Sequence, residues 1–325
     1  MFLLWFERGV PPAMEGELEG GAAAVGPGAG PDPLDTIAKA DGVIASSVLR
    51  YDAAIFDRAP RLKVIARTGI GTELIDIPEA TRRGIAVCNA PDGPTISTAE
   101  HTIALMLAVA KRLKAAEGRL RRGEGNYFVA HDGLELDGRT LGLVGFGRIG
   151  RRVAVLGAAL GMEVLAHDPY AGVDPDLAME SESLERLLAG SDVVSLHLPL
   201  TADNRGMIGA EAIAAMRPGA VLVNAARGGL VDHDALLDAL ERGHLGGAGL
   251  DTTDPEPLPP GHPLFERDDV VVTPHIAAAT GAGKRRLYVT AIREALAVLE
   301  GRKPDHPVNP EVLGGTARDE AQEGA

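Results

Sequence analysis

Nine short apolar runs alternate with helical patterns along most of the chain, and this alternation restricts the fold more than any other feature. Most of the runs are continuously apolar, which is typical of strands buried on both faces of a parallel sheet. Segments with helical periodicity lie between them, such as SLERLLAGS from Ser183 and DHDALLDALERG from Asp232. The alternation predicts an α/β fold of doubly wound parallel sheets. The predicted strands begin at Val43, Leu62, Ile85, Leu141, Glu163, Val193, Ala220, Gly247 and Val270.

The length and charge of the chain limit its organisation and its partners. At 325 residues the chain is too long for one ordinary core, so we expect two domains. Acidic residues outnumber basic ones, 46 to 32, which gives a net charge of −14. This charge disfavours nucleic acid and membrane surfaces as partners. A small anionic substrate stays compatible, because one or two arginines make a pocket locally positive.

Cysteine usage and the first residues indicate the cellular compartment. Cys88 is the one cysteine, which excludes a disulfide within the chain and a thiolate metal cluster, and we expect no metal site. The opening MFLLWF is too short for the apolar core of a signal peptide, and no run approaches membrane-spanning length. We therefore expect a cytoplasmic protein.

Two predicted helices are longer than the rest and flank the central block. They run from about Ser97 to Glu117 and from about Lys284 to Leu299. The simplest arrangement takes the chain into a second domain through the first helix and back through the second. We therefore predict a discontinuous domain of residues 1–98 plus 287–325 and a continuous domain of residues 99–286. Residues 15–33, rich in Gly, Ala and Pro, predict a loose loop, and residues 315–325 a frayed tail.

A glycine-rich turn follows the apolar run from Leu141 and opens a helix. Gly145, Gly147 and Gly150 have GxGxxG spacing, and a second strand ends at Asp168. This context indicates a dinucleotide site, in which glycines permit a tight turn, backbone approach to pyrophosphate and close helix packing. Asp168 would bind the ribose hydroxyls and repel a 2′-phosphate, which favours NAD over NADP. The alternative is a glycine loop that serves packing alone. The predicted cofactor residues here are Gly145, Gly147, Arg148, Ile149, Gly150 and Asp168.

Arg227, Asp251 and His275 each lie at or just beyond the end of a later predicted strand, where ligands bind in open α/β sheets, and Glu256 lies in the segment that follows Asp251. Arg227 could hold a substrate carboxylate through its planar guanidinium. His275 could take or give a proton near neutral pH, and Glu256 could orient its imidazole. Each also has a structural alternative: Arg227 as a surface residue, Glu256 as a solvated loop acid and His275 as a core histidine. Asp251 shares the placement at a strand end.

Several long motifs, in the same order along the chain, resemble the D-isomer-specific 2-hydroxyacid dehydrogenases, a family that includes phosphoglycerate dehydrogenases. The resemblance runs from about Asp41 to Val312, in LKVIARTGIGTELID, TRRGIAVCNAPDG, LGLVGFGRIG, SDVVSLHLPLT, RPGAVLVNAARGGLVD, GAGLD and VVTPHIAAAT. It implies two Rossmann-like domains with a cleft between them, residues 99–286 binding NAD and the discontinuous domain binding substrate. It also implies a homodimer built around the cofactor domains.

The reaction that the resemblance implies is hydride transfer between nicotinamide and C2 of a small D-2-hydroxy or 2-keto acid, of phosphoglycerate, hydroxypyruvate or glyoxylate type. Arg227 then matches the carboxylate-binding arginine, His275 the general acid and base, and Glu256 its partner. Asp251 matches an aspartate that contacts the nicotinamide carboxamide. The remaining implied residues line the two ends of the site: Thr98, His197 and Ala225 at the nicotinamide, and the Ile70–Gly71 backbone at the substrate carboxylate.

Departures from the family pattern leave the substrate open. Thr252-Thr253 replaces a common Val-Phe, and Ala278 stands where glycine is common. Ser46 replaces an arginine found near the phosphate in phosphoglycerate-type members, which weakens the case for a phosphorylated substrate. Arg50 and Arg67 stay open as alternative partners of a phosphate. An NAD(H)-responsive binding protein, as among the family's corepressors, is the alternative function. We interpret His101 as a helix-face or domain-joining residue, because nothing in the sequence pairs it with an acid.

Overall fold

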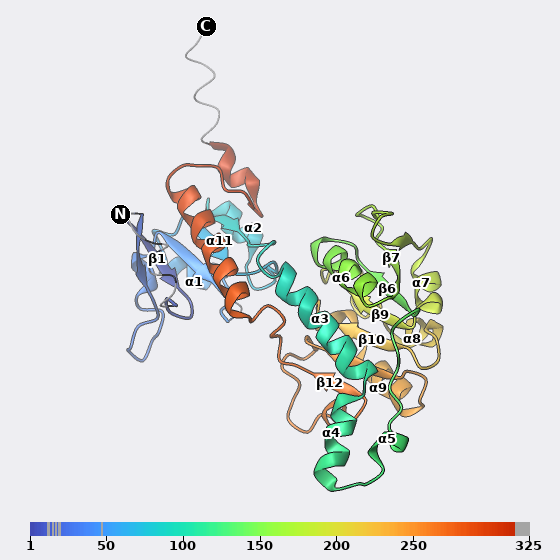
Figure 1. Cartoon of the computed structure of the whole chain (residues 1–325). Helices are drawn as coiled ribbons and strands as arrows, with labels where there is room; N and C mark the ends of the chain where they lie inside the picture. The colour runs from blue at the N-terminus through green and yellow to red at the C-terminus, as the bar shows by residue number, and fades with distance from the viewer. Residues whose placement is uncertain (12–13, 15, 17, 19–20, 47, 316–325) are drawn as a thin grey trace. The chain divides into compact units, whose positions relative to one another are not determined.

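The computed structural model describes residues 1–11, 14, 16, 18, 21–46 and 48–315. The chain divides into two compact units: unit 1 is Met1–Pro94 with the segment from Thr280 onward, and unit 2 is Thr95–Ala279. Each unit contains a parallel sheet with helices on both faces (Figure 1). The prediction of doubly wound parallel sheets is therefore confirmed. Among the described residues, no helix has the length and apolar character needed to cross a membrane, and no group of three potential metal ligands is found.

The described part of unit 1 has a five-stranded parallel sheet in the order β2-β1-β3-β4-β5. One face carries the long helix α11, whose Ile292 and Ala295 are fully buried against the strands. The other face carries the shorter helices α1 and α2. The strands are β1 (Phe2–Phe6), β2 (Ala22–Val25), β3 (Gly42–Ala45), β4 (Val64–Arg67) and β5 (Ala86–Cys88). The helices are η2 (Ile37–Lys39), α1 (Ala53–Arg58), α2 (Ile77–Arg82), α11 (Gly281–Leu299) and η4 (Pro310–Gly315).

The described residues of unit 2 form a seven-stranded parallel sheet in the order β12-β11-β10-β9-β6-β7-β8. The strands are β6 (Thr140–Val144), β7 (Glu163–His167), β8 (Met179–Glu180), β9 (Val193–Leu196), β10 (Val221–Asn224), β11 (Gly247–Leu250) and β12 (Val270–Val272). The chain starts in the middle at β6, builds outward to β8, and then returns to β9 on the other side. The strand order therefore reverses between β6 and β9, where ligands of such sheets bind.

Helices cover both faces of this sheet. Residues of α3 and α6 pack on one face, and residues of α7, α8 and α9 pack on the other. Side-chain caps begin two of these helices where the sequence predicts them, because Ser183 accepts from Arg186 N and Asp232 accepts from Ala235 N. The helices are α3 (Thr95–Ala110), α4 (Leu113–Arg122), α5 (Tyr127–Ala130), α6 (Arg148–Ala159), α7 (Leu184–Gly190), α8 (Ala210–Ala215), η3 (Gly228–Leu230), α9 (His233–Glu241) and α10 (Pro263–Glu266).

All nine predicted strands form, but two other predictions need correction. Residues 15–33 are not entirely a loose loop, because Ala22–Val25 pairs with β1 as a parallel edge strand. Residues 15, 17, 19 and 20 of that prediction lie outside the described residues, as does the predicted tail except Gly315. The predicted helix from Ser97 to Glu117 is two helices, since Arg112 takes the left-handed conformation at φ 47° and ends α3. Helix α4 then continues past Gly118 to Arg122.

Candidate active site

The carboxyl ends of the strands in unit 2 carry the residues from which a site can be built. Because the strands are parallel, the segments that follow β6, β7, β9, β10, β11 and β12 all emerge at the same edge of the sheet. The predicted residues from Gly145 to His275 follow these six strands, with Glu256 in the loop after β11. Thr98 is 5% exposed on α3, and Ala225 is partly exposed directly after β10.

The turn between β6 and α6 requires glycine at two positions. Gly145 has φ +95°, and a Cβ there would lie 2.5 Å from the His197 carbonyl oxygen. A Cβ on Gly150 would lie 2.5 Å from the carbonyl oxygen of Gly145, so the start of α6 packs directly on the turn. Gly147 is exposed, and a Cβ there would meet nothing within 4 Å. Packing within the protein therefore explains why positions 145 and 150 are glycine. Packing does not require glycine at position 147, where the space is open.

The same turn has the properties that a pyrophosphate group needs. Gly147 is the N-cap of α6, and its carbonyl accepts from Arg151 N at 3.0 Å. The N–H groups of Ile149 and Gly150 lie in the first turn of the helix, before that first helical bond, so they have no carbonyl partner within α6. The open space over Gly147 and the positive end of the 12-residue helix fit a dinucleotide.

Asp168, directly after β7, is held by backbone groups around the turn. Its Oδ2 accepts from Phe146 N at 2.7 Å, and its Oδ1 accepts from the N–H groups of Tyr170 and Ala171 at 2.9 Å. Burial alone would raise its pKa, but these three backbone donors hold the pKa of the carboxyl below its usual value. Asp168 therefore stays ionised at neutral pH, and its bond to Phe146 fixes it beside the glycine turn.

His197 follows β9 and faces the other side of the glycine turn. Its Nε2 lies 2.9 Å from the hydroxyl of Ser195. Burial lowers the pKa of His197 to about 3, so the ring is neutral near pH 7. His197 therefore presents a neutral, hydrogen-bonded ring at the point where the strand order reverses.

Arg227 is positioned by a buried amide that the sequence analysis did not single out. Asn224, the last residue of β10, is fully buried. Its side chain accepts from Ala226 N at 3.0 Å and donates to the Arg227 carbonyl at 2.8 Å, so it shapes the turn that carries the arginine. The next residue, Gly228, packs so closely that a Cβ would lie 2.0 Å from the Thr253 carbonyl. The turn after β10 therefore packs closely against the segment that follows β11.

The structure brings Glu256 and His275 together although 19 positions separate them. The Nδ1 atom of His275 lies 2.6 Å from Oε1 of Glu256. Both side chains are partly exposed, at 44% and 41%. Because a carboxylate only accepts, Nδ1 carries the proton, and a neutral imidazole then has a lone pair on Nε2. The pair is therefore an oriented and accessible proton acceptor.

The reason given for interpreting His101 as a helix-face residue, that no acid pairs with it, is wrong. His101, which seemed to lack an acidic partner, lies with Nε2 3.3 Å from Oδ1 of Asp251 and 3.0 Å from the hydroxyl of Thr273. Asp251 is 1% exposed, and the three backbone and side-chain donors around it come from the loop that leads to and past His275. This contact could not be predicted from the sequence, because 150 positions separate His101 from Asp251.

Ile70 and Gly71 lie in unit 1, in the loop after β4. The Ile70 carbonyl accepts from the side-chain amide of Asn89 at 2.9 Å, and Gly69 accepts from Ala90 N at 2.9 Å. These bonds fix the loop against the residues that follow β5. Within the described residues, no intramolecular hydrogen bond uses the N–H groups of Ile70 and Gly71. Both N–H groups are thus available to an anionic group.

Residues 103–277 match the family described as D-isomer specific 2-hydroxyacid dehydrogenase, NAD binding domain. The D-3-phosphoglycerate dehydrogenase of Mycobacterium tuberculosis (strain ATCC 25618 / H37Rv) is 42% identical over 298 residues, which are 90% of this chain and 55% of that protein. The glyoxylate reductase of Thermofilum pendens is 41% identical over 288 residues, 86% of this chain and 84% of that protein.

Among solved structures, the D-lactate dehydrogenase of Aquifex aeolicus, complexed with NAD and lactic acid, is 31% identical. The match has a TM-score of 0.78 and covers 96% of this chain and 98% of that one. The chain spans about half the length of the phosphoglycerate dehydrogenases that it matches, but most of the length of the glyoxylate reductases and of the lactate dehydrogenase.

Proposed function

Because the chain belongs to the D-isomer specific 2-hydroxyacid dehydrogenase family, we propose that it is an NAD-dependent oxidoreductase of small D-2-hydroxy and 2-keto acids. The single observation that carries the proposal is the 2.6 Å contact between Nδ1 of His275 and Oε1 of Glu256. It supplies an oriented proton acceptor at the edge of the sheet that carries the glycine turn. NAD, when bound, supplies or accepts the hydride at C4 of its nicotinamide.

His275 and Glu256 handle the proton in this proposal. During oxidation, Nε2 of His275 accepts the hydroxyl proton while hydride leaves C2, and the adjacent Glu256 carboxylate stabilises the resulting imidazolium. During reduction, the imidazolium returns the proton to the keto oxygen. Glu256 also keeps the ring from rotating, because Nδ1–H donates to its carboxylate.

The remaining roles are to hold the anion and the cofactor. Arg227 of unit 2 binds the substrate carboxylate through its guanidinium. Within unit 1, the N–H groups of Ile70 and Gly71 are donors that an anionic group can use. The glycine turn, with Arg148 and Ile149, binds the pyrophosphate, and Asp168 binds the adenosine ribose. Thr98, His197, Ala225 and Asp251 line the nicotinamide end. Unit 2 thus serves as the cofactor unit and unit 1 as the substrate unit.

We further propose that the substrate carries no phosphate. Glu7, directly after β1, is 6% exposed, and its carboxylate accepts from the N–H groups of Ser46 and Leu49 and from the Ser46 hydroxyl. These donors follow β3 at the edge that also carries the Ile70 loop. Because they already bind a carboxylate of the chain itself, they are not available to a second anionic group. The negative charge of Glu7 also repels a phosphate there.

We also propose a homodimer formed through the exposed segment of α4 and α5. None of the residues in these two helices is buried. Three of them are large apolar residues, and Leu120, Phe128 and Val129 are 63%, 95% and 76% exposed. In unit 2, both helices extend beyond the sheet (Figure 1). Apolar surface of this kind is typical of an interface.

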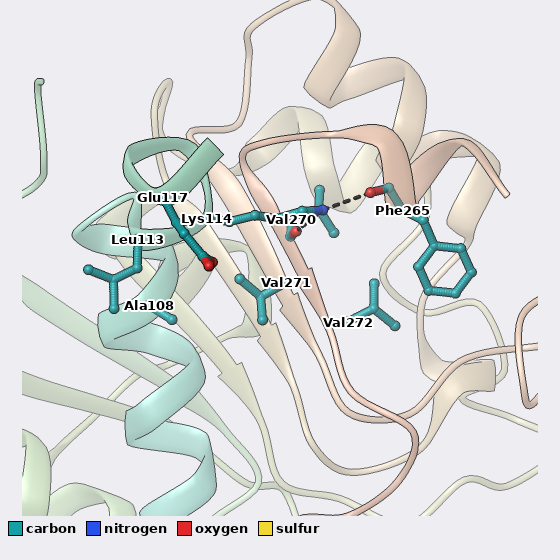
Figure 2. A pocket seen from close by; sticks show the side chains of 8 residues that line it. All are labelled: Ala108, Leu113, Lys114, Glu117, Phe265, Val270, Val271 and Val272. Carbon is teal, nitrogen blue, oxygen red and sulfur yellow. Dashed lines mark hydrogen bonds between the residues drawn. The ribbon is translucent and has the colours of Figure 1, made fainter. Parts of the chain in front are cut away.

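A cavity beside this segment supports the same interface. It has a volume of about 320 Å³ and lies between α4 and the outer strand β12, with Leu113, Phe265 and Val272 in its lining (Figure 2). Lys114 closes one side by donating to the carbonyl of Phe265 at 2.7 Å. A second copy of the chain would cover this apolar hollow together with the exposed helices.

The experiment that tests the function is a panel of keto acids with NADH, followed by the loss of NADH fluorescence. We expect turnover of glyoxylate, hydroxypyruvate or pyruvate, and a kcat/KM for phosphohydroxypyruvate at least about 10-fold below that for hydroxypyruvate. His275→Gln should lower kcat on the order of 10²–10⁴-fold, because it removes a positioned acid and base. Exposed Glu100 on α3 offers a control, and Glu100→Gln should keep the activity.

Two results would contradict the proposal in different ways. NADH binding without turnover of any acid in the panel would favour the alternative, an NAD(H)-responsive binding protein. Turnover that survives His275→Gln nearly unchanged would show that another group handles the proton.

A further inference from the structure

The loop that carries His275 makes several hydrogen bonds to one buried residue, Asp251. The backbone carbonyl of Asp251 accepts from His275 N at 2.7 Å. Its carboxylate accepts from Ile276 N and Ala277 N, each at 2.9 Å, and from the hydroxyl of Thr273 at 2.6 Å. Asp251 therefore holds the residues on both sides of His275 as well as His275 itself.

His275 needs this restraint because its backbone is strained. Its φ of +53° lies in the left-handed region, which a residue with a Cβ adopts only when the surroundings enforce it. The donors from Ile276 and Ala277 reach the two different oxygens of the Asp251 carboxylate. A rotation of that carboxylate would release one of them, so the conformation of His275 depends on the orientation of Asp251.

His101 on α3 is placed to fix that orientation. Its Nε2 lies 3.0 Å from the Thr273 hydroxyl and 3.3 Å from Oδ1 of Asp251. A threonine hydroxyl has one proton, and Thr273 gives it to the ionised Asp251 at 2.6 Å. Thr273 can then only accept from His101, so Nε2 of His101 carries a proton. The donor sequence therefore runs from His101 to Thr273 to Asp251.

We propose that His101 is a positioning residue for the reaction, acting through Thr273 and Asp251 on the conformation of His275; this rests on the proposed function of His275. Helix α3 is a firm base for such a residue, because it packs on β10, β11 and β12 and its Leu105 and Met106 are buried in the core. The hydrogen-bond partners of His101 in the described part of the chain are Thr273 and Asp251, not Glu256 or His275. It acts by holding the loop of residues 273–277 in the one conformation that directs His275 toward Glu256.

The test compares two replacements of His101 in the full-length chain. His101→Leu removes the donor at similar size, whereas His101→Gln keeps an N–H at the same reach as Nε2. We expect His101→Leu to lower kcat on the order of 10- to 100-fold, with the Kd for NADH within about twofold, because a misplaced acid and base slows the chemical step. His101→Gln should restore most of kcat. Glu100→Gln, at an exposed position on the same helix, is the control.

Thr273 gives a second arm to the test. Thr273→Val removes the hydroxyl at nearly constant shape and should lower kcat as His101→Leu does. The double variant should be no slower than the slower single one, since both changes break one sequence of hydrogen bonds. Additive losses, equal losses in His101→Leu and His101→Gln, or an unchanged kcat in His101→Leu would each overturn the proposal.

A readout independent of turnover separates this proposal from the proposed function. Hydrogen exchange measured by mass spectrometry reports on the N–H groups of Ile276 and Ala277, which bond to Asp251. In His101→Leu we expect faster exchange in residues 273–279 and unchanged exchange in the buried strand 221–224. Unchanged exchange in residues 273–279 would overturn the positioning role. Faster exchange in a chain that reduces no keto acid would keep the positioning role and reject the proposed function.

Discussion

His197 is a residue of the site whose titration contributes to the pH dependence of the chain's stability. Its ring bonds to Ser195 next to the glycine turn, and burial lowers its pKa to about 3. In the unfolded chain a histidine has a pKa of about 6.5. Between these two values the unfolded chain binds a proton that the folded chain does not, so stability falls as the pH decreases below about 6.5.

This difference gives a prediction for His197→Gln. Between pH 7.5 and pH 5, the wild-type chain should lose up to about 2 kcal/mol of unfolding free energy relative to the variant, because glutamine does not titrate. Urea unfolding followed by circular dichroism at each pH measures the two curves. His131→Gln, at an exposed position, should parallel the wild type. A constant difference between wild type and His197→Gln over this range would show that the imidazole is not kept neutral by the fold.

His101 and His275 differ in whether their acidic partners could be predicted from the sequence. The pairing of His275 with Glu256 could be predicted, because both follow strand ends within one short stretch and resemble family motifs. The pairing of His101 with Asp251 could not be predicted, since it depends on how α3 crosses the sheet. Asn224 was missed because an amide at the end of an apolar strand has no pattern of its own; its role follows from its complete burial.

In the turn from β6 to α6, one glycine is required by packing within the protein and another leaves space for a ligand. Gly150 faces the Gly145 carbonyl, whereas Gly147 faces open space. Alanine at Gly147 should therefore weaken NADH binding, whereas alanine at Gly150 should lower the stability of the folded chain.

We expect Gly147→Ala to leave the unfolding free energy within about 0.5 kcal/mol of wild type, while the Kd for NADH rises by at least about 10-fold, since the methyl group occupies the space over the turn. Gly150→Ala should instead destabilise the chain by about 1–3 kcal/mol, because its Cβ has no room. Fluorescence titration and thermal unfolding measure the two quantities. Normal NADH binding by Gly147→Ala would place the pyrophosphate elsewhere.

Element boundaries show where sequence patterns stop being informative. The nine strands were predictable, because continuous apolar runs follow directly from burial on both faces of a sheet. The break at Arg112 was not, since KRLKAAEG continues the helical pattern without Gly or Pro before Gly118. In the structure Lys111 donates to the Leu134 carbonyl and Lys114 to three carbonyls of the 265–270 segment, so tertiary contacts fix the change of direction.

At the scale of the whole molecule, the exposed side chains of α4 and α5 predict how copies of the chain associate. Phe128→Asp combined with Leu120→Asp should convert a dimer into a monomer, because charges replace the apolar side chains at the proposed interface. Light scattering coupled to size-exclusion chromatography measures the mass. Tyr170→Asp, at a side chain that is 97% exposed elsewhere in unit 2, should leave the dimer intact. A wild-type chain that is monomeric at micromolar concentration would reject the interface.

The architecture as a whole was predictable, because the strand–helix alternation and the glycine turn specify doubly wound sheets and family motifs span most of the chain. The choice of substrate was not. In the proposed function it depends on contacts such as that of Glu7 with Ser46 and Leu49, which join segments about 40 positions apart.

In the proposed function, hydride passes between nicotinamide C4 and C2 of a 2-keto acid. Reduction of hydroxypyruvate with NADH that carries deuterium at both C4 positions tests this step, with the product examined by NMR and chiral chromatography. We expect D-glycerate that carries deuterium at C2, and the loss of this product when His275→Gln replaces the wild-type chain. Unlabelled glycerate, or deuterium at any other carbon, would show that hydride does not pass from C4 to C2.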